Sequence, residues 1–379
     1  MPLRTRWHIA QATSIGAAAL AAAAGIGGPA SAASTRPNTL PAHTFASATA
    51  SATQPDDITL MEGHIFVGFA NGIAPDGTPG PLGSKSTVVE YRTDGTVAHT
   101  FSLTGKVDGL TADPQDGRLI VTVNEDLNSS LYVVRPDADP PGQVVHYSYD
   151  PSPAEPNSSP PPSTAGGTDS IAISHGHIFV THSNPGQASS AATYEADLDP
   201  DSHIAHLRPV FADNATATDA VTKQKVTLGL TDPDSNRFLP SSSPRFAGQL
   251  AQVAQADGQV VFVDHATTPS PGLTRLNLRN SPASSAPPPV DDIAVATAEQ
   301  GTLYVTDPTG TITALSTAGL PAGTVFAAEA KDTGTPLLGT LDLATGVITP
   351  LGNTFTNPHG LLFVPSHPDS GNDGSQGDA

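Results

Sequence analysis

The chain of 379 residues is acidic and has no cysteine, with 36 Asp and Glu against 16 Lys and Arg and a formal net charge of −20 at pH 7. This charge argues against nucleic acid and anionic membranes as partners, because both are bound through basic protein faces. Without disulfides the fold needs an ordinary hydrophobic core, for which the length suffices. Cations and neutral ligands remain as partners, and much of the charge is expected simply to keep the protein soluble.

Residues 1–32 have the pattern of a secretory signal peptide. Arg4 and Arg6 precede an apolar stretch of small residues that ends in Ala-Ser-Ala, which is the n-region, h-region and cleavage-site order of such segments. Glycines interrupt the stretch, so it is too short and too broken for a permanent membrane helix. We expect cleavage after Ala32, a secreted extracellular protein and a flexible linker at 33–54. The alternative is a buried, Ala-rich helix.

The remaining sequence contains an internal repeat. Each copy has a short apolar strand, a turn that usually contains glycine, and a second strand that ends in valine plus a small or polar residue. Further strand pairs lie between the copies, and the clearest is joined by Asp94-Gly95, a strong hairpin signal. The repeating unit is therefore four antiparallel strands. The clear copies are 56–69, 108–123, 169–182 and 291–307, and a diverged copy is 249–265.

These repeats predict an all-β fold, a β-propeller of four-stranded antiparallel blades. Strands in the last part of the chain include a sixth motif at Pro358-His359-Gly360, so we expect six blades over 55–366. Seven blades and a two-sheet β-sandwich are the alternatives.

Segments rich in proline and serine cannot build a core. On this basis 150–167 and 280–290 are expected to be surface loops, and the polar residues 367–379 are expected to form a disordered tail.

The pattern Asp-x-[Ile/Leu]-[Ala/Thr], then Gly, then [Phe/Tyr/Ile]-Val-Thr resembles the inner two strands of NHL-repeat propellers and of gluconolactonase-like propellers. Propellers of this kind host lactonases, lyases, amidating-type enzymes and plain binding modules. In the gluconolactonase-like relatives a divalent ion is held in the channel by acidic and amide side chains, and in the amidating-lyase-like relatives by histidines. Only the repeated aspartate and Pro358-His359-Gly360 match that motif here.

The repeat register brings one residue of each blade to the same end of the central channel. Four carboxylates and one imidazole would repel one another there unless they were neutralised. Oxygen ligands suit Ca²⁺ first, and a histidine leaves Zn²⁺ or Mn²⁺ open. The alternative is that each aspartate caps its own turn, and the diverged copy offers only Gly248 or Gln249. The predicted metal ligands are Asp56, Asp108, Asp169, Asp291 and His359.

The second strands return to the same end of the channel. His182 and His265 occupy matching places at the ends of HIFVTH and VVFVDH, and Asn71, Asn124 and Asp307 end other second strands. A histidine beside a carboxylate at a channel mouth suits general acid or base catalysis. We therefore predict catalytic roles for the two histidines. The alternative for each is an exposed loop histidine without a role.

Motifs of other enzyme classes are missing from the sequence. It has no Gly-x-Ser-x-Gly, no phosphate-binding Gly-x-x-x-x-Gly-Lys-Ser/Thr, no His-Glu-x-x-His and no signal for an organic cofactor. We expect a secreted, monomeric propeller with a divalent cation in its channel, which acts on a small substrate as a hydrolase, lactonase or lyase. The alternative is a non-catalytic propeller that binds a small ligand or an extracellular protein.

Overall fold

The computed structural model describes residues 39–153, 166–185, 190–281, 286–331 and 335–366. The predicted signal peptide, most of the predicted loop at 150–167 and the predicted tail lie outside them. All regular elements in the described part are β-strands, as predicted. It contains no helix long and apolar enough to cross a membrane.

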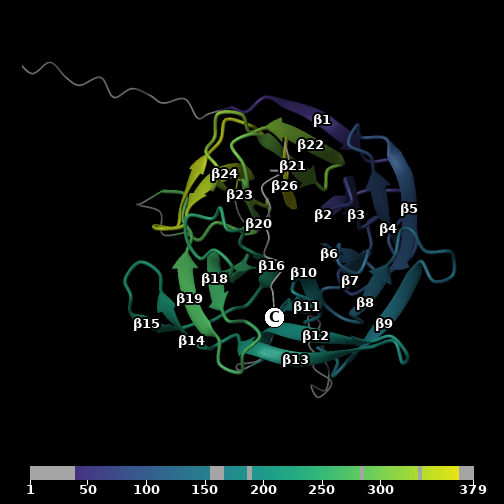
Figure 1. Cartoon of the computed structure of the whole chain (residues 1–379), viewed down its shortest axis with the longest axis horizontal. Coiled ribbons are helices and arrows are strands. Elements are labelled where there is room, and N and C mark those ends of the chain that lie inside the picture. Colours follow the sequence, from purple (N-terminus) through teal and green to yellow (C-terminus); the bar gives the residue numbers. More distant parts are fainter. Residues whose placement is uncertain (1–38, 154–165, 186–189, 282–285, 332–334, 367–379) are drawn as a thin grey trace, which may run out of the picture. The chain divides into compact units, whose positions relative to one another are not determined.

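The first two repeat units each form an antiparallel sheet whose strands follow chain order (Figure 1). In the first, Glu62 and Gly63 turn the chain with φ of 51° and 81°, which suits the twist of a tight hairpin. Its strands are β2 (Pro55–Met61), β3 (His64–Phe69), β4 (Lys85–Tyr91) and β5 (Val97–Thr104). Those of the second are β6 (Val107–Asp113), β7 (Arg118–Val123), β8 (Ser130–Val134) and β9 (Val144–Asp150).

The third and fourth units follow the same plan with additions at their outer edges. Strand β13 pairs in parallel with β9, so the second and third units make one eight-stranded sheet. The third unit comprises β10 (Thr168–Ser174), β11 (His177–His182), β12 (Ala191–Asp199) and β13 (Ile204–Ala212). The fourth comprises β16 (Pro233–Phe238), β17 (Leu250–Ala254), β18 (Gln259–Asp264) and β19 (Gly272–Asn277), extended by β14 (Thr216–Asp219) and β15 (Lys225–Thr227).

The last two sheets exchange strands along the chain. Strand β20 pairs with β23, while β21, which follows β20, pairs with the late strand β26. One sheet has the order β20 (Val290–Val295), β23 (Val325–Glu329), β24 (Leu337–Asp342) and β25 (Val347–Pro350). The other has the order β26 (Leu361–Pro365), β21 (Gly301–Asp307), β22 (Thr311–Ser316) and β1 (Ala42–Ser47).

The inner strands contact one another in a closed cycle, as in a propeller. Strand β2 packs beside β6, β6 beside β10, β10 beside β16, β16 beside β20, β20 beside β26, and β26 beside β2. Apolar clusters fill the space between successive sheets; for example, Phe66 and Val121 belong to one cluster and Ile65 and Ile312 to another. The core is therefore distributed between sheets, and the start of each inner strand faces a shared axis.

Two expectations about strand order were wrong. The segment 249–265 holds the second and third strands of its sheet, not the inner two. The inner strand is β16, and the apolar pattern did not predict it because Asp234, Ser235 and Arg237 make this strand polar. Copy 291–307 is no hairpin, since its two strands lie in different sheets. Hydrophobic alternation marks a strand without naming its partner.

The stretch 33–54, expected to be a flexible linker, contains strand β1. This strand pairs with β22 through a register that shifts between Thr44 and Ala46. Its sequence, AHTFAS, is largely exposed, so it lacks the apolar pattern by which the other strands were recognised.

Candidate functional site

A cavity of about 370 Å³ lies where the inner strands begin. Ten Asp and Glu side chains line it, and its basic lining residues in the described part of the chain are Lys106 and His359. In five of the inner pairs the register shifts next to the first residue, as between Pro55 and Ile58. Such bulges re-aim side chains, and here they carry the repeated aspartates.

The structure brings the predicted ring together. Asp56, Asp108, Asp169, Asp291 and His359 all line this one cavity, and their role as metal ligands stays a prediction. A sixth member that was not predicted from the sequence is Asp234, which holds the equivalent place on β16. The signal was available, because Pro233-Asp234-Ser235-Asn236 repeats the spacing of Pro55-Asp56-Asp57-Ile58.

One part of the ring is neutralised by Lys106. Its Nζ contacts Asp108 Oδ1 and lies 2.7 Å from Glu125 Oε1. Burial alone would lower the pKa of Lys106, but the carboxylates of Asp108 and Glu125 raise it well above its usual value, so the side chain stays a cation. Asp108 Oδ2 is buried and has no hydrogen-bond partner among the described residues.

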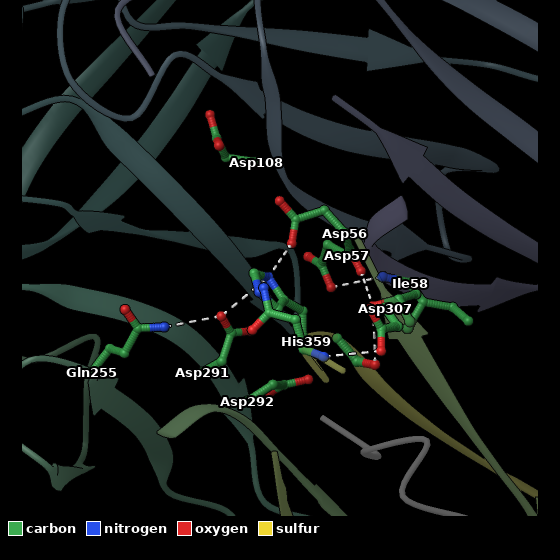
Figure 2. Close-up of polar contacts among 12 residues, drawn as sticks. Asp56, Asp57, Ile58, Asp108, Gln255, Asp291, Asp292, Asp307 and His359 are labelled. Carbon is green, nitrogen blue, oxygen red and sulfur yellow. Dashed lines mark hydrogen bonds and ion pairs between the residues drawn. The ribbon is translucent and has the colours of Figure 1, made fainter. Parts of the chain in front are cut away.

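A second part is organised around His359. Its Nδ1 lies 2.9 Å from Asp56 Oδ1 and 3.3 Å from Asp291 Oδ2, and Gln255 Nε2 donates to the same Asp291 oxygen at 3.0 Å (Figure 2). Burial raises the pKa of Asp56, but the hydrogen bond and charge of His359 outweigh it and leave that pKa below its usual value. This imidazole is thus held between two carboxylates at the cavity wall.

The third part of the ring, Asp169 and Asp234, has no such partner. In the described part of the chain neither carboxylate has a hydrogen bond or an ion pair. Burial raises the pKa of both well above the usual value; Asp291 and Asp169 add to the effect on Asp234, and Glu125 adds to that on Asp169. The hydroxyl of Ser235, next along β16, is also buried without a partner among these residues.

Asp57 and Asp292 connect neighbouring inner strands below the ring. Asp57 accepts hydrogen bonds from the backbone N–H of Ile58 and of Leu110, at 2.8 and 2.7 Å. Burial, with the nearby charge of Asp292, raises the pKa of Asp57 to about 8. Asp292 instead binds Arg237 Nη2 through both oxygens, at 2.8 and 2.6 Å. These contacts hold the strands in place around the cavity.

The two histidines predicted to be catalytic lie elsewhere. His182 is 2% exposed and its Nδ1 lies 2.7 Å from the carbonyl oxygen of Ala191. The side chain of His265 is 74% exposed, and its Nδ1 lies 3.1 Å from Asp264. Neither lines the cavity, so the structure does not bring the two to the ring, and their catalytic role stays a prediction.

The other residues at the ends of second strands hold backbone. Asn71 Oδ1 accepts from Thr53 N at 2.9 Å, and Asn124 Oδ1 accepts from Lys106 N at 2.8 Å. Asp307 Oδ2 accepts from the backbone of two loop residues, at 2.9 and 3.0 Å. These side chains hold together backbone segments that are 18 to 50 residues apart in the chain.

The donor atoms fit a hard cation that retains water. Among the described residues, no group of three or more His, Asp or Glu side chains is arranged to hold a metal ion. The cavity nevertheless offers carboxylate oxygens without partners and two buried, unpartnered oxygens, Asp108 Oδ2 and Ser235 Oγ. Mg²⁺ characteristically binds through one or two carboxylates and keeps several waters.

No family model and no curated protein matches the chain. Among solved structures, a periplasmic gluconolactonase of Pseudomonas aeruginosa is 14% identical, with a TM-score of 0.46, over 82% of this chain and 88% of that one. A Bacteroides caccae protein of unknown function is 12% identical, with a TM-score of 0.46, over 82% and 86%. A streptogramin B lyase is 10% identical, with a TM-score of 0.41, over 86% and 95%. Likeness at this level says nothing about activity.

Proposed function

We propose that the chain is an exported β-propeller of six four-stranded blades whose acidic cavity binds a divalent cation and acts on a small substrate as a hydrolase, lactonase or lyase. The observation that carries the proposal is the charge of the cavity, ten carboxylates against two basic residues. So many carboxylates around one cavity repel one another, and a bound cation relieves that repulsion. The unpartnered oxygens of Asp108 and Ser235 supply further ligands of the same kind.

Different residues would bind the cation and transfer the proton. Ring carboxylates would hold the ion, and a divalent ion in such a place polarises a carbonyl group or activates water. His359, rather than His182 or His265, is then the residue that moves the proton, because it lines the cavity. Asp56 Oδ1 lies within hydrogen-bond distance of His359 Nδ1, which fixes the orientation of the imidazole.

The test is cation binding by the full chain, followed by activity. After treatment with chelator, the protein is titrated with Mg²⁺, Ca²⁺, Mn²⁺ and Zn²⁺ by calorimetry, with melting followed by circular dichroism. We expect near-stoichiometric binding and a higher melting temperature, because a ligand of the folded state stabilises it. The exposed Asp201→Asn variant serves as a control and should bind like the wild type.

Turnover then separates the two functional classes. The loaded protein is incubated with a panel of lactones and small esters, and products are identified by mass spectrometry. Cation-dependent turnover that is lost in His359→Asn supports the enzyme. Binding without turnover of any panel member favours the non-catalytic propeller, and no binding of any cation by the wild type overturns the proposal.

A further inference from the structure

The ring is symmetric in its backbone but not in its charge. Six equivalent positions face the cavity, with aspartate at five and His359 at the sixth. Two basic side chains contact three of the aspartates, and one of the two, His359, itself holds the sixth position. Lys106 contacts Asp108, and His359 contacts Asp56 and Asp291. A guest that entered at either place would compete with a basic side chain that the chain already supplies.

The remaining two positions, Asp169 and Asp234, are neighbours. They begin β10 and β16, which pack side by side, and Asp169 lies close enough for its charge to act on Asp234. No side chain among the described residues donates a hydrogen bond to either carboxylate. Both line the cavity, so both are open to a guest from that side.

Ser235 gives independent evidence for a ligand at this place. Ser235 is 8% exposed and lines the same cavity. Its Oγ has no hydrogen-bond partner in the described part of the chain. Burying a hydroxyl without a hydrogen bond costs free energy, because the group loses its bonds to water and gains none in the protein. A buried hydroxyl oxygen without a hydrogen bond, beside two carboxylates that line the cavity, is suited to contact a bound ion or its waters.

We infer that the cation of the proposed function, on which this inference rests, binds off-centre between Asp169 and Asp234 beside Ser235, as a hydrated hard ion of the Mg²⁺ type. Two carboxylates with retained water is the usual way that proteins hold Mg²⁺, whereas Ca²⁺ takes six to eight oxygens and Zn²⁺ favours nitrogen or sulfur ligands. Asp56, Asp108 and Asp291 then pair with Lys106 and His359.

Single Asp→Asn variants of the full chain test this placement by calorimetry with MgCl2. Asp169→Asn and Asp234→Asn should each weaken Mg²⁺ binding by about tenfold or more, the usual effect of altering a metal site. The matched variants Asp56→Asn and Asp291→Asn should stay within about threefold of the wild type. Ca²⁺ and Zn²⁺, titrated in parallel, should bind more weakly than Mg²⁺.

Melting curves provide a second readout that needs no binding signal. Asp234→Asn removes a repelling charge, so it should raise the melting temperature without Mg²⁺ and abolish the increase that Mg²⁺ gives the wild type. If Asp234→Asn does not fold, Ser235→Ala decides, and a Mg²⁺ affinity unchanged from the wild type contradicts the inference. Equal losses in Asp56→Asn and Asp234→Asn would place the ion on the axis instead. Absence of any cation binding by the wild type would instead defeat the proposed function.

Discussion

Two sides of the same cavity carry the same motif and behave differently. On one side Asp56, Asp108 and Asp291 contact Lys106 or His359, and on the other neither the carboxylate of Asp169 nor that of Asp234 has a hydrogen bond or an ion pair in the described part of the chain, although the charge of Lys106 also acts on Asp169. The backbone bulge is shared, so the repeat alone does not separate the two sides. A repeated position thus specifies where a side chain lies, and its neighbours from other strands specify its charge state.

Removal of Lys106 should have the largest effect on the difference between the two sides of the cavity. Lys106→Met leaves the buried Asp108 and the half-buried Glu125 without their cation, and losing one member of a buried pair costs about 3–5 kcal/mol. We expect a correspondingly lower free energy of unfolding in urea. The exposed Lys85→Met variant should change it by no more than about 0.5 kcal/mol.

The same variant should also convert the neutralised side into a second site for a cation. Added Mg²⁺ should therefore recover part of the lost stability in Lys106→Met. Wild-type stability in this variant would show that Lys106 is not the counter-charge of that side.

A buried carboxyl outside the cavity shows how burial changes a carboxyl pKa away from the charges of the ring. Glu329 is 1% exposed and accepts one hydrogen bond from Asn280, and burial raises its pKa from 4.5 to about 7. A raised pKa means that the folded state favours the protonated form, so this contribution to stability is full below pH 4.5 and is lost as the pH rises through 7.

Glu329→Gln should therefore be more stable than the wild type at pH 8 relative to pH 5, by on the order of 2 kcal/mol. Urea unfolding at the two pH values measures the difference. Because Glu329 does not line the cavity, Mg²⁺ should leave this difference unchanged. A difference of the same size at both pH values would show that the carboxyl is ionised throughout.

The smallest expected effect is on cation affinity in His359→Asn. If His359 is an internal partner of Asp56 and Asp291 rather than a ligand, its loss should change Mg²⁺ affinity by less than about threefold, because asparagine can still donate one hydrogen bond. Calorimetry with MgCl2 measures this. A loss of about tenfold or more would return His359 to the ligand set predicted from the sequence.

The sequence predicted the strand-rich fold and five of the six ring positions because the repeat is local. Asp-x-[Ile/Leu] and its following hairpin lie within a few residues, so one chain segment carries both. Asp234 was not predicted because β16 is polar and β17 after it is apolar. The apolar pattern of the repeat was therefore matched to β17 and β18 instead of β16 and β17.

The side-chain contacts across the ring could not be predicted from the local repeat. Lys106 lies near Asp108 in the chain, but His359 meets Asp56 across 303 residues. Such contacts depend on closure of the cycle, and no spacing in the sequence encodes them. For the same reason the isolation of Asp169 and Asp234 became visible only in three dimensions.

The strand exchange between the last two sheets has a consequence for synthesis on the ribosome. Strand β20 emerges before β21 and β22 but must wait for β23, while β21 waits for β26 near the end of the described chain and β22 also takes β1 from its beginning. Neither sheet can be completed early, and the order of emergence is not the order of pairing. Closure of the ring therefore waits for the synthesis of β26, and a nascent chain arrested before His359 carries an incomplete cavity wall.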